Sequence, residues 1–122
     1  MEGIHHVALR VRDCVASARF YEQTFGLREI RRLEEGDHVQ AVWLGVGDAV
    51  LMLERSIRGA GLPEGSGHVL IFLSGDLVAA ETKMNDLGVR VTDRTASTLY
   101  VLDPDGHRAG VSVYPFVSEV RS

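Results

Sequence analysis

Two histidines stand at the start of two similar stretches of this 122-residue chain. "HVALRVRD" begins at His6 and "HVLIFLSGD" begins at His68. Two histidines with one carboxylate can hold Fe(II), Mn or Zn and leave coordination positions open for a substrate. Whether these residues can do such chemistry depends on the elements that carry them and on a carboxylate that shares their face.

The two stretches extend into a repeat of half the chain. His6 and His68, and likewise Gly26 and Gly88, are each 62 residues apart. Each copy begins with an apolar run and continues into a helix-length segment with apolar residues three or four positions apart. Each segment follows an aspartate suited to cap a helix and ends at a glycine suited to the left-handed exit. The pattern predicts one helix per copy.

Strand-like segments follow both helices. The first copy continues with "LREIRRLE", "HVQAVWLGV" and "AVLMLE", and the second with "VRVTDR", "STLYVLD" and "AGVSVYP". The turns "GVGD" and "DPDG" separate the last two strands of each copy, and the Gly-rich segment 55–67 reads as a linker. The sequence therefore predicts an α+β fold in one domain, 1–122, with two βαβββ modules at about 1–57 and 66–118. Modules this small need each other for stability, so we expect one curved mixed β-sheet cup with the helices on its outer face.

Alternation along the strands predicts which side chains face the cup. On the first strand His6 and Arg10 share a face, opposite Val7 and Leu9. The same reasoning places further residues in the cup: His68, Leu70 and Phe72, then Met52 and Glu54, and finally Tyr100, Gly110, Ser112 and Tyr114.

The doubled pattern resembles the vicinal oxygen chelate superfamily, which includes glyoxalase I, extradiol dioxygenases and the fosfomycin- and bleomycin-resistance proteins. The resemblance spans nearly the whole chain, on "IHHVALRVRD", "ARFYEQTFGL", "GHVLIFLSGD" and "YVLDPDGHRAGV". Metal-using members place ligands on the first and last strand of each module. His6 and His68 match the first-strand positions, whereas Met52 and Gly110 stand where the last-strand carboxylates are expected.

The resemblance leaves two main functions open. In the first, His6 and His68 hold a divalent Fe, Mn or Zn ion, with Glu54, one pleat repeat from Met52, as the carboxylate. That protein would be a lyase- or dioxygenase-like enzyme rather than a glyoxalase I, because Glu54 cannot easily serve as both ligand and proton-transfer base. In the second, the cup is a metal-free binding site of the bleomycin-resistance type for a drug or aromatic compound. The ligand-contacting residues would then be Arg10, Met52, Phe72, Tyr100, Gly110, Ser112 and Tyr114. A third alternative is a structural or regulatory partner whose cup is vestigial.

The composition of the chain limits the kinds of partner that the protein is expected to bind. The net charge of −4, a pI near 5.7 and the absence of a basic cluster argue against nucleic acid, and no apolar stretch approaches the roughly 20 residues of a membrane helix. The N-terminus does not read as a signal peptide, so we expect a cytoplasmic protein. Cys14 falls in the apolar stripe of the first helix and is predicted to be a buried, inert thiol. Small members of the resembled group are commonly dimers, so a homodimer is expected.

Overall fold

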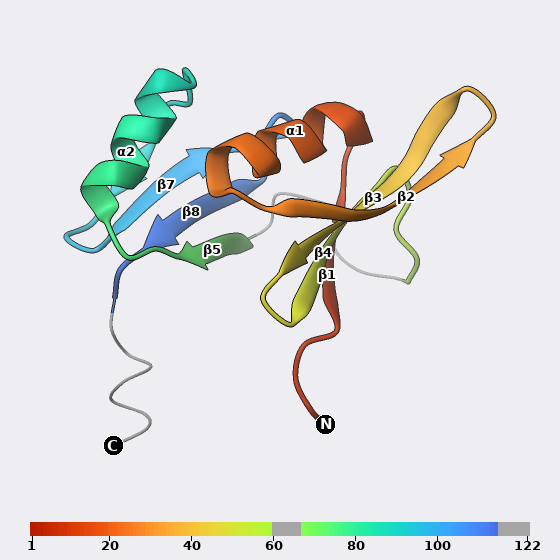
Figure 1. Ribbon diagram of the computed structural model, residues 1–122, viewed down its shortest axis with the longest axis horizontal. Coiled ribbons are helices and arrows are strands. Elements are labelled where there is room, and N and C mark those ends of the chain that lie inside the picture. The colour runs from red at the N-terminus through yellow and green to blue at the C-terminus, as the bar shows by residue number, and fades with distance from the viewer. Residues whose placement is uncertain (60–66, 115–122) are drawn as a thin grey trace.

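A computed structural model of the chain describes residues 1–59 and 67–114, so most of the predicted linker, Pro63 included, lies outside the described residues (Figure 1). The first module contains β1 (His6–Arg10), α1 (Cys14–Phe25), β2 (Arg28–Glu35), β3 (His38–Val46) and β4 (Ala49–Glu54). The second contains β5 (Val69–Leu73), α2 (Leu77–Asp86), β6 (Asp93–Arg94), β7 (Thr98–Leu102) and β8 (Arg108–Ser112). The predicted α+β fold with two βαβββ modules is confirmed.

Each module builds its own four-stranded mixed sheet. The strand orders are β1-β4-β3-β2 and β5-β8-β7-β6, with the first pair parallel and the others antiparallel in both. No hydrogen-bonded strand pair joins the two sheets within the described residues, so in one chain the cup consists of two sheets rather than one continuous sheet. The segment "VRVTDR" contributes only a two-residue strand, because Val89 and Val91 pack against the core and only Asp93 and Arg94 pair with β7.

The helix ends follow the predicted capping residues. Asp13 accepts hydrogen bonds from the backbone N–H groups of Val15 and Ala16, and Asp76 accepts one from Ala79. Satisfying these otherwise unpaired donors starts each helix. Gly26 and Gly88 have φ values of +72° and +73°, the left-handed conformation that glycine adopts without a Cβ clash.

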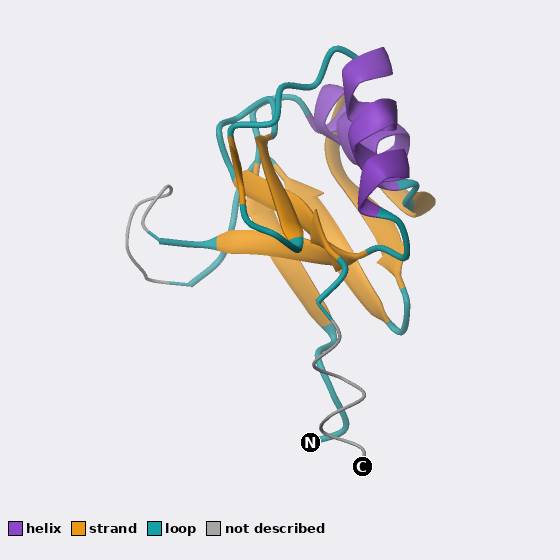
Figure 2. Cartoon of the chain, turned by 90° about the vertical axis from the view of Figure 1, so that its left-hand side faces the viewer, coloured by secondary structure: helices purple, strands orange, loops and turns teal. Residues whose placement is uncertain are grey.

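Both helices lie on the same side of the molecule (Figures 1 and 2). In the first module α1 packs against β2, β3 and β4, and in the second α2 packs against β7 and β8. The alternate residues that face the helices are apolar and form the core; they include Val42, Leu44, Leu51 and Leu53 in one sheet and Leu99, Val101 and Ala109 in the other. This period of two leaves the opposite face of each sheet without a helix over it.

Contacts between the modules centre on α1 and the "DPDGH" turn. The Tyr21 hydroxyl donates a 2.9 Å hydrogen bond to Asp103 Oδ2, and both residues are buried. The Ser17 hydroxyl donates to the Asp105 carboxylate, and Arg12 donates to it through its side chain and backbone. His107 Nε2 lies 2.7 Å from the Arg10 carbonyl, so His107 ties the turn to β1 rather than standing free in solvent as its position in a turn suggests.

In the described part of the chain, no helix has the length and apolar character needed to cross a membrane.

Candidate functional site

The face of each sheet that turns away from the helices is the candidate site, and we call it the open face. Strand registers define its rows in the first module. His6 pairs with Val50, Ala8 with Met52 and Arg10 with Glu54. Each row continues across β3 and then β2. The row of Met52 continues with Trp43 and Arg31, and the row of Val50 continues with Gly45 and Arg28. The row of Glu54 continues with Ala41 and Leu33. The predicted placement of His6, Arg10, Met52 and Glu54 on one face agrees with these registers.

In the second module the first strand presents different residues from those expected. Leu70 pairs with buried Ala109, and both Leu70 and Phe72 pack on the helix side of the sheet. The Phe72 ring lies 4.5 Å from that of Phe25 and 6.3 Å from that of Tyr21, centroid to centroid, and both partners are on α1. The placement of Phe72 and Leu70 in the cup was therefore wrong. The open face of β5 instead carries Val69, Ile71 and Leu73.

A one-residue shift explains this difference. His6 lies seven residues before its helix cap Asp13 (13 − 6 = 7), whereas His68 lies eight before Asp76 (76 − 68 = 8). Val69, and not His68, therefore occupies the position in β5 that His6 occupies in β1. His68 itself is exposed and lies just before β5. If the alternation of β5 is extended by one residue, His68 falls on the same side as Leu70, opposite to the side of His6, because a shift of one residue reverses a side chain's face. The count to the cap was the sequence signal that could have revealed this.

Gly110 lies on the open face of β8, between Ile71 of β5 and Tyr100 of β7. A Cβ added at Gly110 would meet the Leu99 carbonyl oxygen at 2.2 Å and Ile71 Cδ1 at 3.1 Å. Nothing larger than glycine fits here without a backbone shift. At the family's last-strand ligand position, then, the carboxylate is absent and its space is taken by a neighbouring strand.

The three predicted metal ligands are not brought together in one chain. His6 pairs with Val50, and Glu54 is four residues further along β4, about 13 Å at 3.3 Å per residue. His6 Nδ1 also lies 2.8 Å from His5 Nδ1, so this nitrogen is engaged. Among residues 1–59 and 67–114, no group of three or more His, Cys, Asp or Glu could hold a metal ion. The potential ligands among the described residues therefore do not assemble a metal centre in one chain.

Positive charge gathers on the open face of the first module. Arg10, Arg28 and Arg31 all belong to its rows. In the second module, Arg108 lies on the open face of β8 and pairs with Val69. The Arg31 guanidinium lies 5.2 Å from the centre of the Trp43 ring, a cation–π arrangement. Sequence reasoning missed Arg28 and Arg31, because a register shift between Glu29 and Arg31 breaks the alternation of β2.

The other residues predicted to contact a ligand differ in how exposed they are and in whether their polar groups are already hydrogen-bonded. Tyr100 is half-buried on the open face of β7. The Ser112 hydroxyl is already engaged, since it receives a hydrogen bond from Thr98 at 2.8 Å and one from the Tyr114 N–H at 3.2 Å. Tyr114 is exposed beyond the end of β8. Cys14 is buried, and this burial raises the pKa of its thiol, which agrees with the inert thiol predicted.

Residues 3–111 match the family described as the glyoxalase/bleomycin resistance protein/dioxygenase superfamily, and this match covers most of the chain. The chain belongs to that superfamily. The predicted resemblance is thereby confirmed, and with it the assignment of the doubled module.

Two curated relatives of the superfamily are similar in sequence. The metallothiol transferase FosB of Bacillus licheniformis is 27% identical over 115 residues, covering 87% of this chain and 71% of FosB. The uncharacterized protein YwbC of Bacillus subtilis is 31% identical over 114 residues, covering 84% of this chain and 90% of YwbC.

Solved structures of superfamily members share the fold. The fosfomycin resistance protein FosX from Mesorhizobium loti superposes with a TM-score of 0.75 at 20% identity, covering 100% of this chain and 99% of FosX. TnmS3, an antibiotic binding protein from Streptomyces sp. CB03234, superposes with a TM-score of 0.72 at 20% identity, covering 92% and 95% of the two chains. At these identities the likeness concerns the fold alone.

Proposed function

We propose that this protein binds a planar, anionic small molecule on the open face and does so without a metal ion. The observation that carries the proposal is Gly110. The position where a metal-using member would place a carboxylate is filled by the Leu99 carbonyl and Ile71. With this ligand position closed, the sheet faces that no helix covers can still serve a binding function.

The side chains on the open face indicate the chemical class of the ligand. Trp43, Met52 and Ile71 offer apolar surface on which an aromatic ring can lie. Arg10, Arg28 and Arg31 add guanidinium groups, which bind carboxylates and phosphates through two parallel hydrogen bonds. An aromatic or conjugated acid matches both features.

The names of related proteins support a binding role. TnmS3 is named as an antibiotic binding protein, and it shares the fold. FosB is named as a metallothiol transferase, and a FosX from Listeria monocytogenes was crystallised with Mn(II). The second candidate function, a metal-assisted enzyme, therefore rests on these relatives and on His6, which stays at the first-strand position.

A binding experiment can use Trp43, the chain's single tryptophan, as a reporter on the open face. We expect 4-nitrobenzoate to quench Trp43 fluorescence in metal-stripped protein and its neutral isostere 4-nitrobenzamide to do so only weakly. Arg31→Gln should weaken binding about tenfold, the effect of losing one charge-assisted hydrogen bond. Arg19→Gln, on the exposed side of α1, removes the same charge elsewhere and should leave the affinity unchanged.

Metal content decides between the two candidates. Protein dialysed against Fe(II), Mn(II) and Zn(II) and then desalted should retain no stoichiometric metal, by mass spectrometry. Retention of about one ion per chain that is lost in both His6→Ala and Glu54→Ala would overturn the binding proposal and make the enzyme the working hypothesis. Equal quenching by 4-nitrobenzoate and 4-nitrobenzamide would show that the ligand need not be anionic, but would leave the proposed binding on the open face standing.

A further inference from the structure

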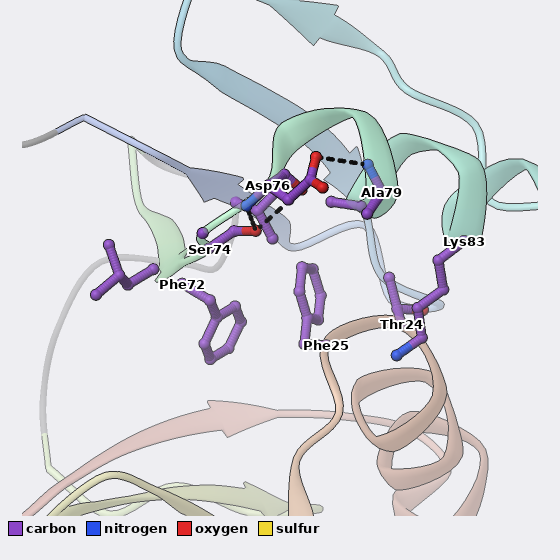
Figure 3. A pocket seen from close by; sticks show the side chains of 11 residues that line it. Thr24, Phe25, Phe72, Ser74, Asp76, Ala79 and Lys83 are labelled. Atoms are coloured by element: carbon purple, nitrogen blue, oxygen red, sulfur yellow. Dashed lines mark hydrogen bonds between the residues drawn. The ribbon is translucent and has the colours of Figure 1, made fainter.

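A cleft lies between the two helices, on the side of the sheets opposite to the open face (Figure 3). Of its lining residues, Leu73 at the end of β5 also belongs to the open face. The cleft has a volume of about 390 Å³, within the range of small-molecule sites. The C-terminal turn of α1 forms one wall, the start of α2 forms the other, and the ends of β5 and β8 close it. Because both modules contribute, the cleft exists only when α1 is packed against the second module.

Two phenylalanines form the apolar side of the cleft. Phe25 and Phe72 are each half-buried, with ring centres 4.5 Å apart and planes inclined by 35°. Opposite them, α2 presents Ala79 and Ala80, whose methyl groups leave space for a guest. An aromatic ring or a branched hydrocarbon placed there would contact the phenyl groups and the two methyl groups.

The polar groups at the start of α2 are already used. The Ser74 hydroxyl accepts a hydrogen bond from the Asp76 N–H and donates to the Asp76 carbonyl, while Asp76 Oδ1 accepts from the Ala79 N–H. These bonds are drawn as dashed lines in Figure 3. They belong to the helix cap and bring little that a ligand could bind.

Lys83 is the charged side chain of the cleft that the helix cap does not use. It is the chain's only lysine, beside twelve arginines, and it lines the cleft from α2. Its Nζ reaches toward the end of α1, 4.0 Å from where a Cβ would stand at Gly26. Within residues 1–59 and 67–114 the Lys83 ammonium has neither an ion pair nor a hydrogen bond. Figure 3 shows it beside Thr24 at one end of the cleft, with Phe25 between it and Phe72.

From this arrangement we propose that the cleft is a second binding site, for a small arylalkanoate or similar carboxylate. The hydrocarbon part lies on Phe25 and Phe72, and the carboxylate accepts hydrogen bonds from the Lys83 ammonium. The two groups complement the two halves of such a ligand, and their separation from the open face makes this site independent of the function proposed above.

The single lysine gives a direct test with 3-phenylpropionate as the probe. An amine-acylating reagent can modify only Lys83 and the N-terminal amine, so peptide mass spectrometry reads both rates in one sample. We expect 3-phenylpropionate to slow acylation of Lys83 several-fold and to leave the N-terminal rate unchanged. The neutral 3-phenylpropanamide should protect about tenfold less well, because it lacks the charge-assisted hydrogen bond.

Variants separate the two halves of the site. By calorimetry, Lys83→Met should weaken binding of 3-phenylpropionate about tenfold, and Ala80→Leu, which fills the cleft, should weaken it at least as much. Arg90→Met, which removes an exposed cation just after α2, is the matched control and should bind as the parent does. Circular dichroism melting of each variant checks that the fold is intact.

Three results would overturn the proposal. They are binding that Lys83→Met and Ala80→Leu leave unchanged, equal protection of Lys83 and the N-terminus, and absence of any binding by the parent protein. Quenching of Trp43 by 3-phenylpropionate in both variants would assign the ligand to the open face instead. The binding of 4-nitrobenzoate to the open face is measured separately, through Trp43 fluorescence. A negative result at one site therefore does not affect the interpretation of the experiment at the other.

Discussion

At the scale of single residues, the phenol of Tyr21 is a buried polar group that joins the two modules. It is buried on α1 and donates to Asp103, whose other oxygen accepts the backbone N–H groups of Asp105 and His107. Burial, and then the charge of Asp103 beside it, raises the pKa of Tyr21 far above its usual value. One hydroxyl thus holds the "FYEQTFGL" helix to the "LDPDGH" turn, and this gives a structural role to two of the motifs that carry the family resemblance.

We expect Tyr21→Phe to lower the free energy of unfolding by about 1–3 kcal/mol, since a buried carboxylate oxygen loses its partner. Tyr100→Phe is the matched control, because no hydrogen bond of its hydroxyl occurs within the described residues. Urea unfolding at neutral pH measures both. Equal losses in the two variants would mean that the Asp103 bond contributes nothing specific.

The same phenol predicts a pH dependence. The folded pKa of Tyr21 lies above the unfolded value near 10, so the folded state holds the phenol proton more tightly. Its stabilising contribution is intact below about pH 10 and is lost as the pH rises above that value. Urea titrations between pH 9 and about 11 should show a steeper loss of stability in the parent than in Tyr21→Phe. Parallel curves would contradict this.

The close packing around Gly110 leads to a prediction about stability. Gly110→Ala should cost about 1–3 kcal/mol, because its Cβ would stand 2.2 Å from the Leu99 carbonyl oxygen and strands must move apart. Gly45→Ala, where the nearest atom is Ile30 Cγ2 at 3.5 Å, has ordinary contacts and should change stability much less. Thermal melts of both compare them. If Gly110→Ala is as stable as Gly45→Ala, a side chain fits at position 110 and the ligand position there is open.

At the scale of elements, helix exits and strand registers decide which residues face the site. The two helices end at glycines with left-handed backbone, and each exit directs the chain into the next strand. The registers then carry alternate residues to the open face, so a single inserted residue before α2 is enough to move His68 to the other side. Small changes in an element's length thus have large consequences for chemistry.

Gly88→Ala should lower the stability by about 1–2 kcal/mol, because a residue with a Cβ is strained at φ +73° although nothing lies within 4 Å. Gly75→Ala, in an equally open position without positive φ, should be neutral or slightly stabilising. Chemical denaturation distinguishes the two. Similar effects of both substitutions would undermine the backbone explanation.

At the scale of the whole molecule, the open face of the second module carries apolar side chains that are exposed in one chain. Leu73 has an exposed fraction of 82%, and Val69 and Ile71 beside it on β5 are also exposed. Contiguous apolar surface of this kind usually marks an interaction site. A second copy that covers the end of β5 would bury these side chains and enclose the open face.

We therefore expect a homodimer, with a mass of two chains by light scattering. Leu73→Asp should shift the protein to the monomer, because a buried unpaired carboxylate is costly. Val78→Asp, on α2 with a similar exposed fraction of 77%, is the matched control and should remain dimeric. A parent mass of one chain, or dissociation by both variants alike, would contradict the predicted interface.

Sequence reasoning alone was sufficient for what depends on neighbours along the chain. Asp13, Asp76, Gly26 and Gly88 could be assigned as helix ends, and "HVQAVWLGV" and "AVLMLE" as strands, because capping, backbone conformation and period-two alternation are local properties. The doubled module followed from these, whereas the superfamily was identified from the resemblance of its motifs to known members.

Only the tertiary structure decided which faces and which modules meet. The Phe72 ring packs against Phe25 of α1, and Gly110 lies too close to the β7 backbone for any side chain. Tyr21 donates a hydrogen bond to Asp103, which is 82 residues away in the sequence. None of these has a local signature, because register is set by pairing with a distant strand and one residue of slip reverses a face. The cleft around Lys83 exists for the same reason, since it lies between elements that the sequence alone does not bring together.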